Sequence, residues 1–379
     1  MVASQMVVLQ TTNNSEHSNI NSNTVSMEEG YGNEIGVRKE KILRICHINI
    51  NGIPESKDHE KNVQLRQAIN EGGFQIVGLS ETNRCWHLIE EENRWKSRSK
   101  GWWEASKASL AYNVKDGELS TPFQPGGTMV LSLNTAAHRV FEIGKDTTGL
   151  GRWSWSRYRG RHDLILHVIS AYRPCIPQDP GENTTHSQHQ RYLDAHNDTH
   201  HPRNAMLEDL ESHITQYKNQ GDQIVVLMDC NEDVRRARIT TWLQRLELTD
   251  VIMSTHGSTQ APATYNRGSK PIDGIFCSST IPVQACGYLP FGAFPLDHRG
   301  LWIDVLYENA FGYKIPRCIQ PAAQKLQCKD PRVVSKWVNA YDSFIRTHNL
   351  HVQQFELERL ATSPLTPAMA KEFEDILEL

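Results

Sequence analysis

The chain has 379 residues, of which 38% are hydrophobic, so its length allows one large domain or two ordinary ones. No stretch approaches the ~18 continuous apolar residues that a membrane-spanning helix needs, which argues against a membrane protein. The formal net charge of -4 neither favours nor excludes nucleic acid as a partner. Any electrostatic case for DNA therefore depends on local basic patches.

Eight cysteines are present, and no two lie at a Cys-x-x-Cys spacing, which argues against a zinc ribbon or a redox motif. Several of them, such as Cys46, Cys230 and Cys277, lie within or just after apolar runs. We therefore expect buried free thiols and a reducing compartment. The first basic residue is Arg38. This argues against a signal or transit peptide, and we expect an intracellular protein, nuclear or cytoplasmic.

Residues 1–38 are poor in aromatic side chains and include a segment, 11–24, that is mostly Asn, Ser and Thr. We interpret them as a disordered tail, because they cannot bury enough surface to offset the entropy of ordering. From residue 42 the sequence becomes more apolar. Runs typical of β-strands occupy 42–50, 74–79, 128–133, 163–172, 223–228 and 272–276. Helical patterns lie between some of them. This alternation predicts one α/β or α+β domain over residues 41–306.

Two further segments are distinctive. Residues 175–203 are polar and rich in histidine, and we interpret them as a solvated insertion loop, with metal capture by the histidines as the alternative. After Leu306 the pattern becomes helical, so residues 307–379 are predicted to form a helical C-terminal extension. Thr366 and Pro367 are typical of the start of a final helix that ends at Leu379.

Chemically useful side chains recur where the apolar runs end or pause. In chain order they are Asn49 and Asn51, Glu81, Tyr172, Asp229 and Asn231, Asp273, and Asp297 with His298. Most of these signals have ordinary explanations, since Asn-Gly is a common turn pair and a tyrosine often packs in a core. Two are stronger. Asp229 and Asn231 share one face of the chain, and a carboxylate inside an apolar strand, as at 273, is costly unless it is paired or functional.

If these strands share one sheet system, their ends converge on one edge or cleft. The converging groups would supply carboxylate and amide oxygens, an imidazole and a phenol. Hard oxygen ligands suit Mg²⁺ or Mn²⁺, which keep part of their water and bind substrate phosphate. The constellation therefore predicts metal-assisted hydrolysis of a phosphoester.

In their order these residues resemble the endonuclease/exonuclease/phosphatase superfamily over roughly residues 41–306. The start Asn49-Ile50-Asn51-Gly52 and the ending Asp297-His298-Arg299-Gly300 resemble the endonuclease domains of non-LTR retrotransposons, whose reverse transcriptase part is absent here. The resemblance implies a four-layer α/β sandwich in which two β-sheets are packed between helices.

The resemblance also implies roles for individual residues. Glu81 would bind the metal with Asn51, Asp297 and Asp229. Asp229 would also act as the general base, and Asp273 would orient His298, which stabilises the transition state. The groups implied to contact the water or the phosphate are Asn49, Asn231, Tyr172, Arg152 and Thr264.

Three positions depart from the family pattern. Met228 stands where glycine is usual, Leu296 where a small residue is usual, and Ile48 where tryptophan is common. None of these changes removes a reactive group. The change at Met228 bears on how closely the backbone can approach the site.

Two basic segments rich in aromatic residues, 94–103 and 152–161, favour DNA as the substrate. Lys96, Arg98, Arg157 and Arg159 are the candidate DNA contacts, and the alternative is a half-buried strand with Trp inside and Arg outside. The leading prediction is a Mg²⁺-dependent endonuclease that nicks duplex DNA, without a membrane partner or an organic cofactor. The alternatives are a phosphatase or phosphodiesterase acting on inositol phosphate or lipid head groups, and a catalytically degenerate nucleic-acid-binding remnant of a retroelement.

Overall fold

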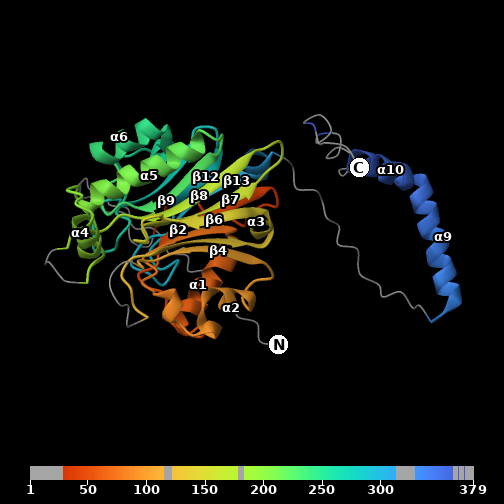
Figure 1. Cartoon of the computed structure of the whole chain (residues 1–379), viewed down its shortest axis with the longest axis horizontal. Coiled ribbons are helices and arrows are strands. Elements are labelled where there is room, and N and C mark those ends of the chain that lie inside the picture. Colours follow the sequence, from red (N-terminus) through yellow and green to blue (C-terminus); the bar gives the residue numbers. More distant parts are fainter. Residues whose placement is uncertain are drawn as a thin grey trace, which may run out of the picture.

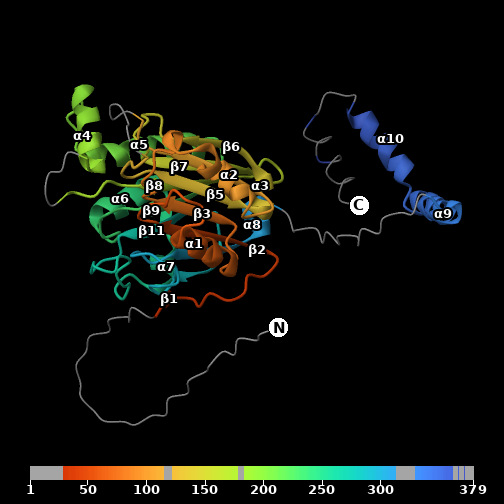
Figure 2. The same ribbon diagram turned by 90° about the horizontal axis from the view of Figure 1, so that it is seen from below.

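The computed structural model describes residues 29–114, 122–177, 183–312, 329–361, 366 and 371. Two mixed β-sheets face each other in the main body (Figures 1 and 2). The first has seven strands in the order β1-β12-β13-β2-β3-β5-β4. Their bounds are Tyr31–Gly32 (β1), Ile42–Asn49 (β2), Ile76–Ser80 (β3), Ser106–Ala111 (β4), Thr128–Leu133 (β5), Val283–Tyr288 (β12) and Leu301–Leu306 (β13).

The second sheet has six strands in the order β10-β11-β9-β8-β7-β6. Their bounds are Val140–Lys145 (β6), Trp153–Arg159 (β7), Ile165–Tyr172 (β8), Gln223–Asp229 (β9), Leu248–Asp250 (β10) and Asp273–Ser278 (β11). Each sheet contains one parallel pair, β2 with β3 and β8 with β9, and the other pairs are antiparallel. A parallel pair needs a crossover connection. Helices supply it in both cases.

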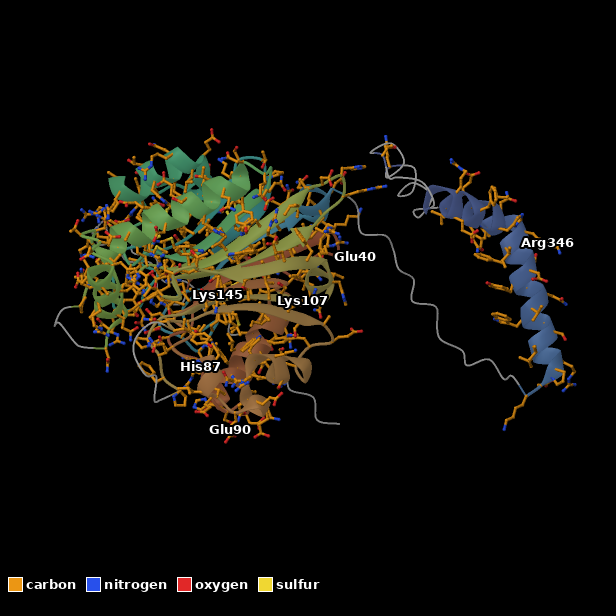
Figure 3. All side chains as sticks on the ribbon, in the orientation of Figure 1. Glu40, His87, Glu90, Lys107, Lys145 and Arg346 are labelled. Carbon is orange, nitrogen blue, oxygen red and sulfur yellow. The ribbon has the colours of Figure 1, made fainter. Side chains whose placement is uncertain are left out.

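Some helices of the main body lie on the outer face of one sheet, and others contact strands of both sheets. The helices are α1 (Glu60–Glu71), α2 (Trp95–Lys100), α3 (Asn134–Arg139), α4 (Thr185–Ala195), α5 (Pro202–Lys218), α6 (Ala237–Leu246), α7 (Val251–His256) and α8 (Tyr307–Phe311), followed by α9 (Pro331–Thr347) and α10 (Leu350–Ala361). Two short 3₁₀ helices, Trp86–Leu88 and Glu91–Asn93, precede α2, and Figure 3 shows His87 and Glu90 at the α1 and α2 end of the molecule.

Three hydrophobic clusters define the layers. One cluster joins the outward side chains of the first sheet to α1 and α2, and another joins the outward side chains of the second sheet to α5 and α6. The third lies between the sheets, where Ile45 of β2 and Val225 of β9 are both fully buried. Because side chains alternate along a strand, the neighbours of Ile45 point to the helical layer, as Cys46 does. The predicted four-layer sandwich is confirmed.

The predicted organisation needs two corrections. Tyr31 and Gly32 pair with Tyr288 and Gly287, so the tail predicted over 1–38 extends too far, because an antiparallel ladder orders residues 31–32. Residues 1–28 lie outside the described part of the chain. The segment 175–203 is also not a plain loop, since α4 and the start of α5 lie within it, and a Thr184–Ser187 capping box begins α4.

Helices α9 and α10 agree with the helical pattern predicted after Leu306. Helix α9 buries no residue, and its side chains, Arg346 among them, project outward from the helix in Figure 3. The helix predicted from Thr366 to Leu379 lies almost entirely outside the described residues. Among the residues that the structure describes, no helix is both long and apolar enough to cross a membrane.

Asp250 provides a test of the fold that is independent of function. Its Oδ1 accepts hydrogen bonds from the backbone N–H groups of Ile252 and Met253 at the start of α7, whereas its Oδ2 is shielded from solvent without a partner among the described residues. Burial raises the pKa of this carboxyl to about 7, although the two backbone hydrogen bonds oppose the shift. In the unfolded chain this carboxyl has the ordinary aspartate pKa of about 3.9. Stability is therefore lost as the pH rises from that value through the folded pKa.

We expect Asp250→Asn to stabilise the protein at about pH 8 by roughly 1–3 kcal/mol, because asparagine keeps the helix cap and removes the buried charge. The gain should shrink as the pH falls towards about 4. Urea unfolding at several pH values measures both effects. An equal gain at every pH would contradict this account.

Candidate active site

Four polar residues converge at one end of the two parallel strand pairs. Asn49 ends β2, Glu81 follows β3, Tyr172 ends β8 and Asp229 ends β9. Within each parallel pair the strands run in the same direction, so their polar ends emerge together. The two parallel pairs, one from each sheet, meet at this end, where Asn49 Nδ2 donates a hydrogen bond to Asp229 Oδ2 at 2.8 Å. The convergence predicted from the sequence is present.

Asp229 lies at the centre of this group and is fully buried. Its Oδ1 accepts a hydrogen bond of 2.8 Å from the backbone N–H of Asn231, whose left-handed φ of +46° turns the chain back over the carboxylate. The Asn231 amide donates to the carbonyl of Arg173 at 2.8 Å. Burial first, and then the charge of Asp273, raise the pKa of Asp229 well above its usual range, although His298 opposes the shift. A carboxylate of raised pKa is suited to accept a proton.

Asp273 and His298 form a buried pair beside Asp229. Asp273 Oδ2 lies 2.9 Å from His298 Nδ1, and one ligand atom from each of Asp229, Asp273 and His298 lies within 4.8 Å of the others. Burial lowers the pKa of His298, but the charge of Asp273 and the hydrogen bond to it outweigh this and raise the pKa to about 10. His298 is therefore an imidazolium at neutral pH. Thr264 positions the aspartate, since its hydroxyl accepts a hydrogen bond from the backbone N–H of Asp273.

A second group of oxygen atoms lies on the first-sheet side. Asn51 Nδ2 donates to Asp297 Oδ2 at 3.1 Å, and Asp297 Oδ1 is buried without a partner among the described residues. The Gly52 N–H donates to the Glu81 carbonyl at 2.7 Å, which holds Asn51 beside Glu81. Burial, the charges of Glu81 and Asp229, and a hydrogen bond to Glu81 raise the pKa of Tyr172 well above its ordinary value. This set of carboxylate and amide oxygens, with one buried oxygen unpaired, fits a hard divalent cation such as Mg²⁺.

No protein-family model matches the chain, and no curated protein matches its sequence. Solved structures do match. The catalytic domain of Xenopus laevis APE2 has a TM-score of 0.52 at 14% identity, over 70% of this chain and 92% of that one. The AP endonuclease LMAP from Leishmania major has a TM-score of 0.53 at 10% identity, over 70% of this chain and 88% of that one. The chain has the endonuclease/exonuclease/phosphatase fold.

The predicted superfamily fold is thereby confirmed. The endonuclease domain of TRAS1, a telomere-specific non-LTR retrotransposon, also matches, with a TM-score of 0.44 at 12% identity over 70% of this chain and 99% of that one. In this chain's version of the endonuclease/exonuclease/phosphatase fold, Met228 is buried in the cluster with α5 and α6, on the side of β9 away from Asp229. Leu296 packs against the cluster with α1 and α2. Neither departure from the family pattern takes the place of a polar group.

Within the endonuclease/exonuclease/phosphatase fold, two predicted phosphate contacts have structural partners instead. Arg152 is only 2% exposed, and it donates two hydrogen bonds to Asp146, at 2.7 and 3.0 Å, and forms an ion pair with Asp209 at 2.8 Å. Thr264 is fully buried, and its hydroxyl accepts hydrogen bonds from the backbone N–H groups of Ile272 and Asp273. In the structure both side chains are engaged by partners within the fold, and their assignment to substrate phosphate stays a prediction.

Of the four predicted DNA contacts, two are buried and two are exposed. Arg98 is buried against three backbone carbonyls, and Arg157 is buried in ion pairs with Asp222 and Glu142, so neither presents a free cation. Arg159 is exposed but pairs in register with Ile165 at the start of β8. At ~3.3 Å per residue it lies roughly 20 Å from the end of β8, where Tyr172 enters the site. Lys96 is exposed on α2.

The structure adds one residue to the site that had no predicted role. His47 lies on β2, two residues before Asn49, and its Nε2 is 3.3 Å from Asp273 Oδ1. The alternation of side chains along β2 already places it on the same face as Asn49. That alternation is the signal in the sequence that could have identified it.

Proposed function

We propose that this protein is a divalent-metal-dependent phosphodiesterase and, more specifically, an endonuclease that nicks duplex DNA by water attack on phosphate. The observation that carries the proposal is the buried group of Asp229, Asp273 and His298, whose ligand atoms lie within 4.8 Å of one another. It combines a carboxylate of raised pKa with an oriented imidazolium. The carboxylate can serve as a general base, and the imidazolium can stabilise the charge that develops on the phosphate; phosphoester hydrolysis needs both functions from side chains.

The reaction can be written from the residues present. Asp229 accepts a proton from the attacking water. The water oxygen forms a bond to phosphorus, and the bond from phosphorus to the leaving oxygen breaks. His298, held by Asp273, stabilises the charge that develops on the phosphate oxygens. Asn49, Asn231 and Tyr172 would contact the water or the phosphate. A divalent cation would be held by Glu81, Asn51, Asp297 and Asp229 and would polarise the phosphate.

Two observations support DNA as the substrate. The solved structures with TM-scores above 0.5 include an AP endonuclease, so the fold is used by a DNA-processing enzyme. Cationic side chains also stand at the rim of the site. The Arg267 side chain is 75% exposed and 3.9 Å from Asp297, and Lys270 in the same loop is exposed. Such groups can neutralise DNA phosphates, which makes binding dependent on salt.

The test is nicking of supercoiled plasmid by the full chain, with Mg²⁺, with Mn²⁺, and with a chelator in place of metal. We expect conversion to the open circular form only when metal is present. Inositol phosphate and sphingomyelin are assayed in parallel. Turnover of either substrate by a folded, metal-loaded protein that leaves the plasmid intact would overturn the nuclease proposal. No turnover of any substrate would indicate a degenerate domain.

We expect Glu81→Gln to shift the metal dependence of nicking. Glutamine removes one carboxylate from the ligand set, so the Mg²⁺ concentration for half-maximal rate should rise about 10–100-fold, equivalent to roughly 1.4–2.8 kcal/mol of metal binding. The rate at saturating metal should recover at least in part. Metal titrations of the wild type, of Glu81→Gln and of the exposed control Glu60→Gln measure this. An unchanged titration curve would remove Glu81 from the metal site.

A further inference from the structure

His47 is a buried histidine at the interface between the two sheets. It is fully shielded from solvent and pairs in register with Gly78 of β3 and Leu301 of β13. Gly78 lets the second sheet approach closely, because a Cβ atom there would meet Leu227 of β9 at 2.6 Å. A polar ring at such a position is costly unless it has a partner.

The partner comes from the other sheet. His47 Nε2 lies 3.3 Å from Asp273 Oδ1, while the second oxygen of the same carboxylate, Oδ2, lies 2.9 Å from His298 Nδ1. His47 Nδ1 is buried and has no hydrogen-bond partner among the described residues. Because an ionised carboxylate can only accept, the nitrogen that faces Asp273 must carry a proton. The geometry therefore selects the tautomer of His47 with hydrogen on Nε2.

We propose that His47 is a positioning residue for the reaction, which fixes the carboxylate of Asp273 so that its other oxygen orients His298. The proposal rests on the proposed function, since orientation of His298 matters only if His298 acts on a phosphate. A carboxylate held at one oxygen alone can rotate about its terminal bond, whereas a donor on each oxygen fixes its plane. Outer partners that orient a reacting group through another residue typically contribute about 10–100-fold to activity.

The contacts from His47 through Asp273 to His298 also link the two sheets. His47 belongs to the first sheet and Asp273 to the second, while His298 lies in the loop before β13. The three side chains therefore depend on how the two sheets sit against each other. Asn49 and Asp229 make the neighbouring polar contact across the same interface, at 2.8 Å.

The test compares His47→Met with His47→Gln, two unbranched side chains of similar size. Only glutamine can donate a hydrogen bond to Asp273. We expect His47→Met to lower kcat for plasmid nicking about 10–100-fold with little change in KM, and His47→Gln to recover most of that loss. Equal losses in the two variants would mean that His47 only fills space, and full activity in His47→Met would also overturn the proposal.

A second readout does not depend on activity. In nitrogen-15 NMR spectra, the hydrogen-bonded Nδ1 proton of His298 should shift in His47→Met and return towards the wild-type position in His47→Gln. The wild-type spectrum should also show His47 protonated on Nε2 and unprotonated on Nδ1. The opposite tautomer would overturn the proposal even if His47→Met fails to fold. Should the protein hydrolyse no phosphoester, these spectra still decide the orientation of His298, so failure of the proposed function is recognised separately.

Discussion

Replacing Asp229 by asparagine is expected to reduce metal-dependent nicking by at least about 1,000-fold, more than 4 kcal/mol of transition-state stabilisation. The change is almost isosteric, although the amide keeps one acceptor oxygen for the two donors, Asn49 Nδ2 and the Asn231 N–H. What it loses is the ability to accept a proton from water and the negative charge next to the metal. Initial rates on supercoiled plasmid at saturating Mg²⁺ measure the effect.

The loss should not come from unfolding. Asp229 is fully buried close to Asp273, so removing its charge relieves repulsion in the metal-free protein. We expect the thermal midpoint of Asp229→Asn without metal to equal or exceed that of the wild type. Asp194→Asn, the same change at an exposed position on α4, is the control and should keep full activity. Retention of more than about a tenth of the wild-type rate would exclude Asp229 as the base.

The second large effect is expected at His298. Its pKa of about 10 keeps the ring charged at neutral pH, and the Asp273 carboxylate fixes its orientation. Replacement by glutamine removes a preorganised cation from the place where charge develops, so kcat should fall about 100–1,000-fold. KM should change little, because the charge acts mainly in the transition state.

A steady-state assay on a short duplex that separates kcat from KM tests this expectation. His200→Gln is the matched control, because its side chain is 57% exposed and lies on the polar segment before α5. If the loss in His298→Gln appeared entirely in KM, His298 would be a substrate-binding residue and its assigned role would be wrong.

The convergence of these polar side chains could be predicted from the sequence because its signals are local. An apolar run that ends in a polar residue places that residue at a strand end, and the alternation along β2 sets the face on which Asn49 lies. The parallel pairs then carry Glu81, Tyr172 and Asp229 to the same place. None of these steps requires knowledge of a distant partner.

The basic residues were predicted poorly for the opposite reason. Arg157 and Asp222 are 65 residues apart in the sequence, and their contact exists only because β7 lies beside β8 and the turn before β9. Arg152 likewise finds Asp209 on α5. A run of arginines and tryptophans has the same composition whether its cations face DNA or buried carboxylates. Only the tertiary structure distinguishes the two cases.

The sheet order has a consequence for how the site assembles during synthesis. β13, residues Leu301–Leu306, is the last strand in the part of the chain that the structure describes, yet it lies between β12 and β2 within the first sheet. Asp297 and His298 come just before it. A ribosome-bound chain therefore cannot complete its reactive centre until this strand has emerged and inserted, long after Asn49 and Glu81 were made. Such non-local pairing is slow, so we expect the site to assemble late in folding.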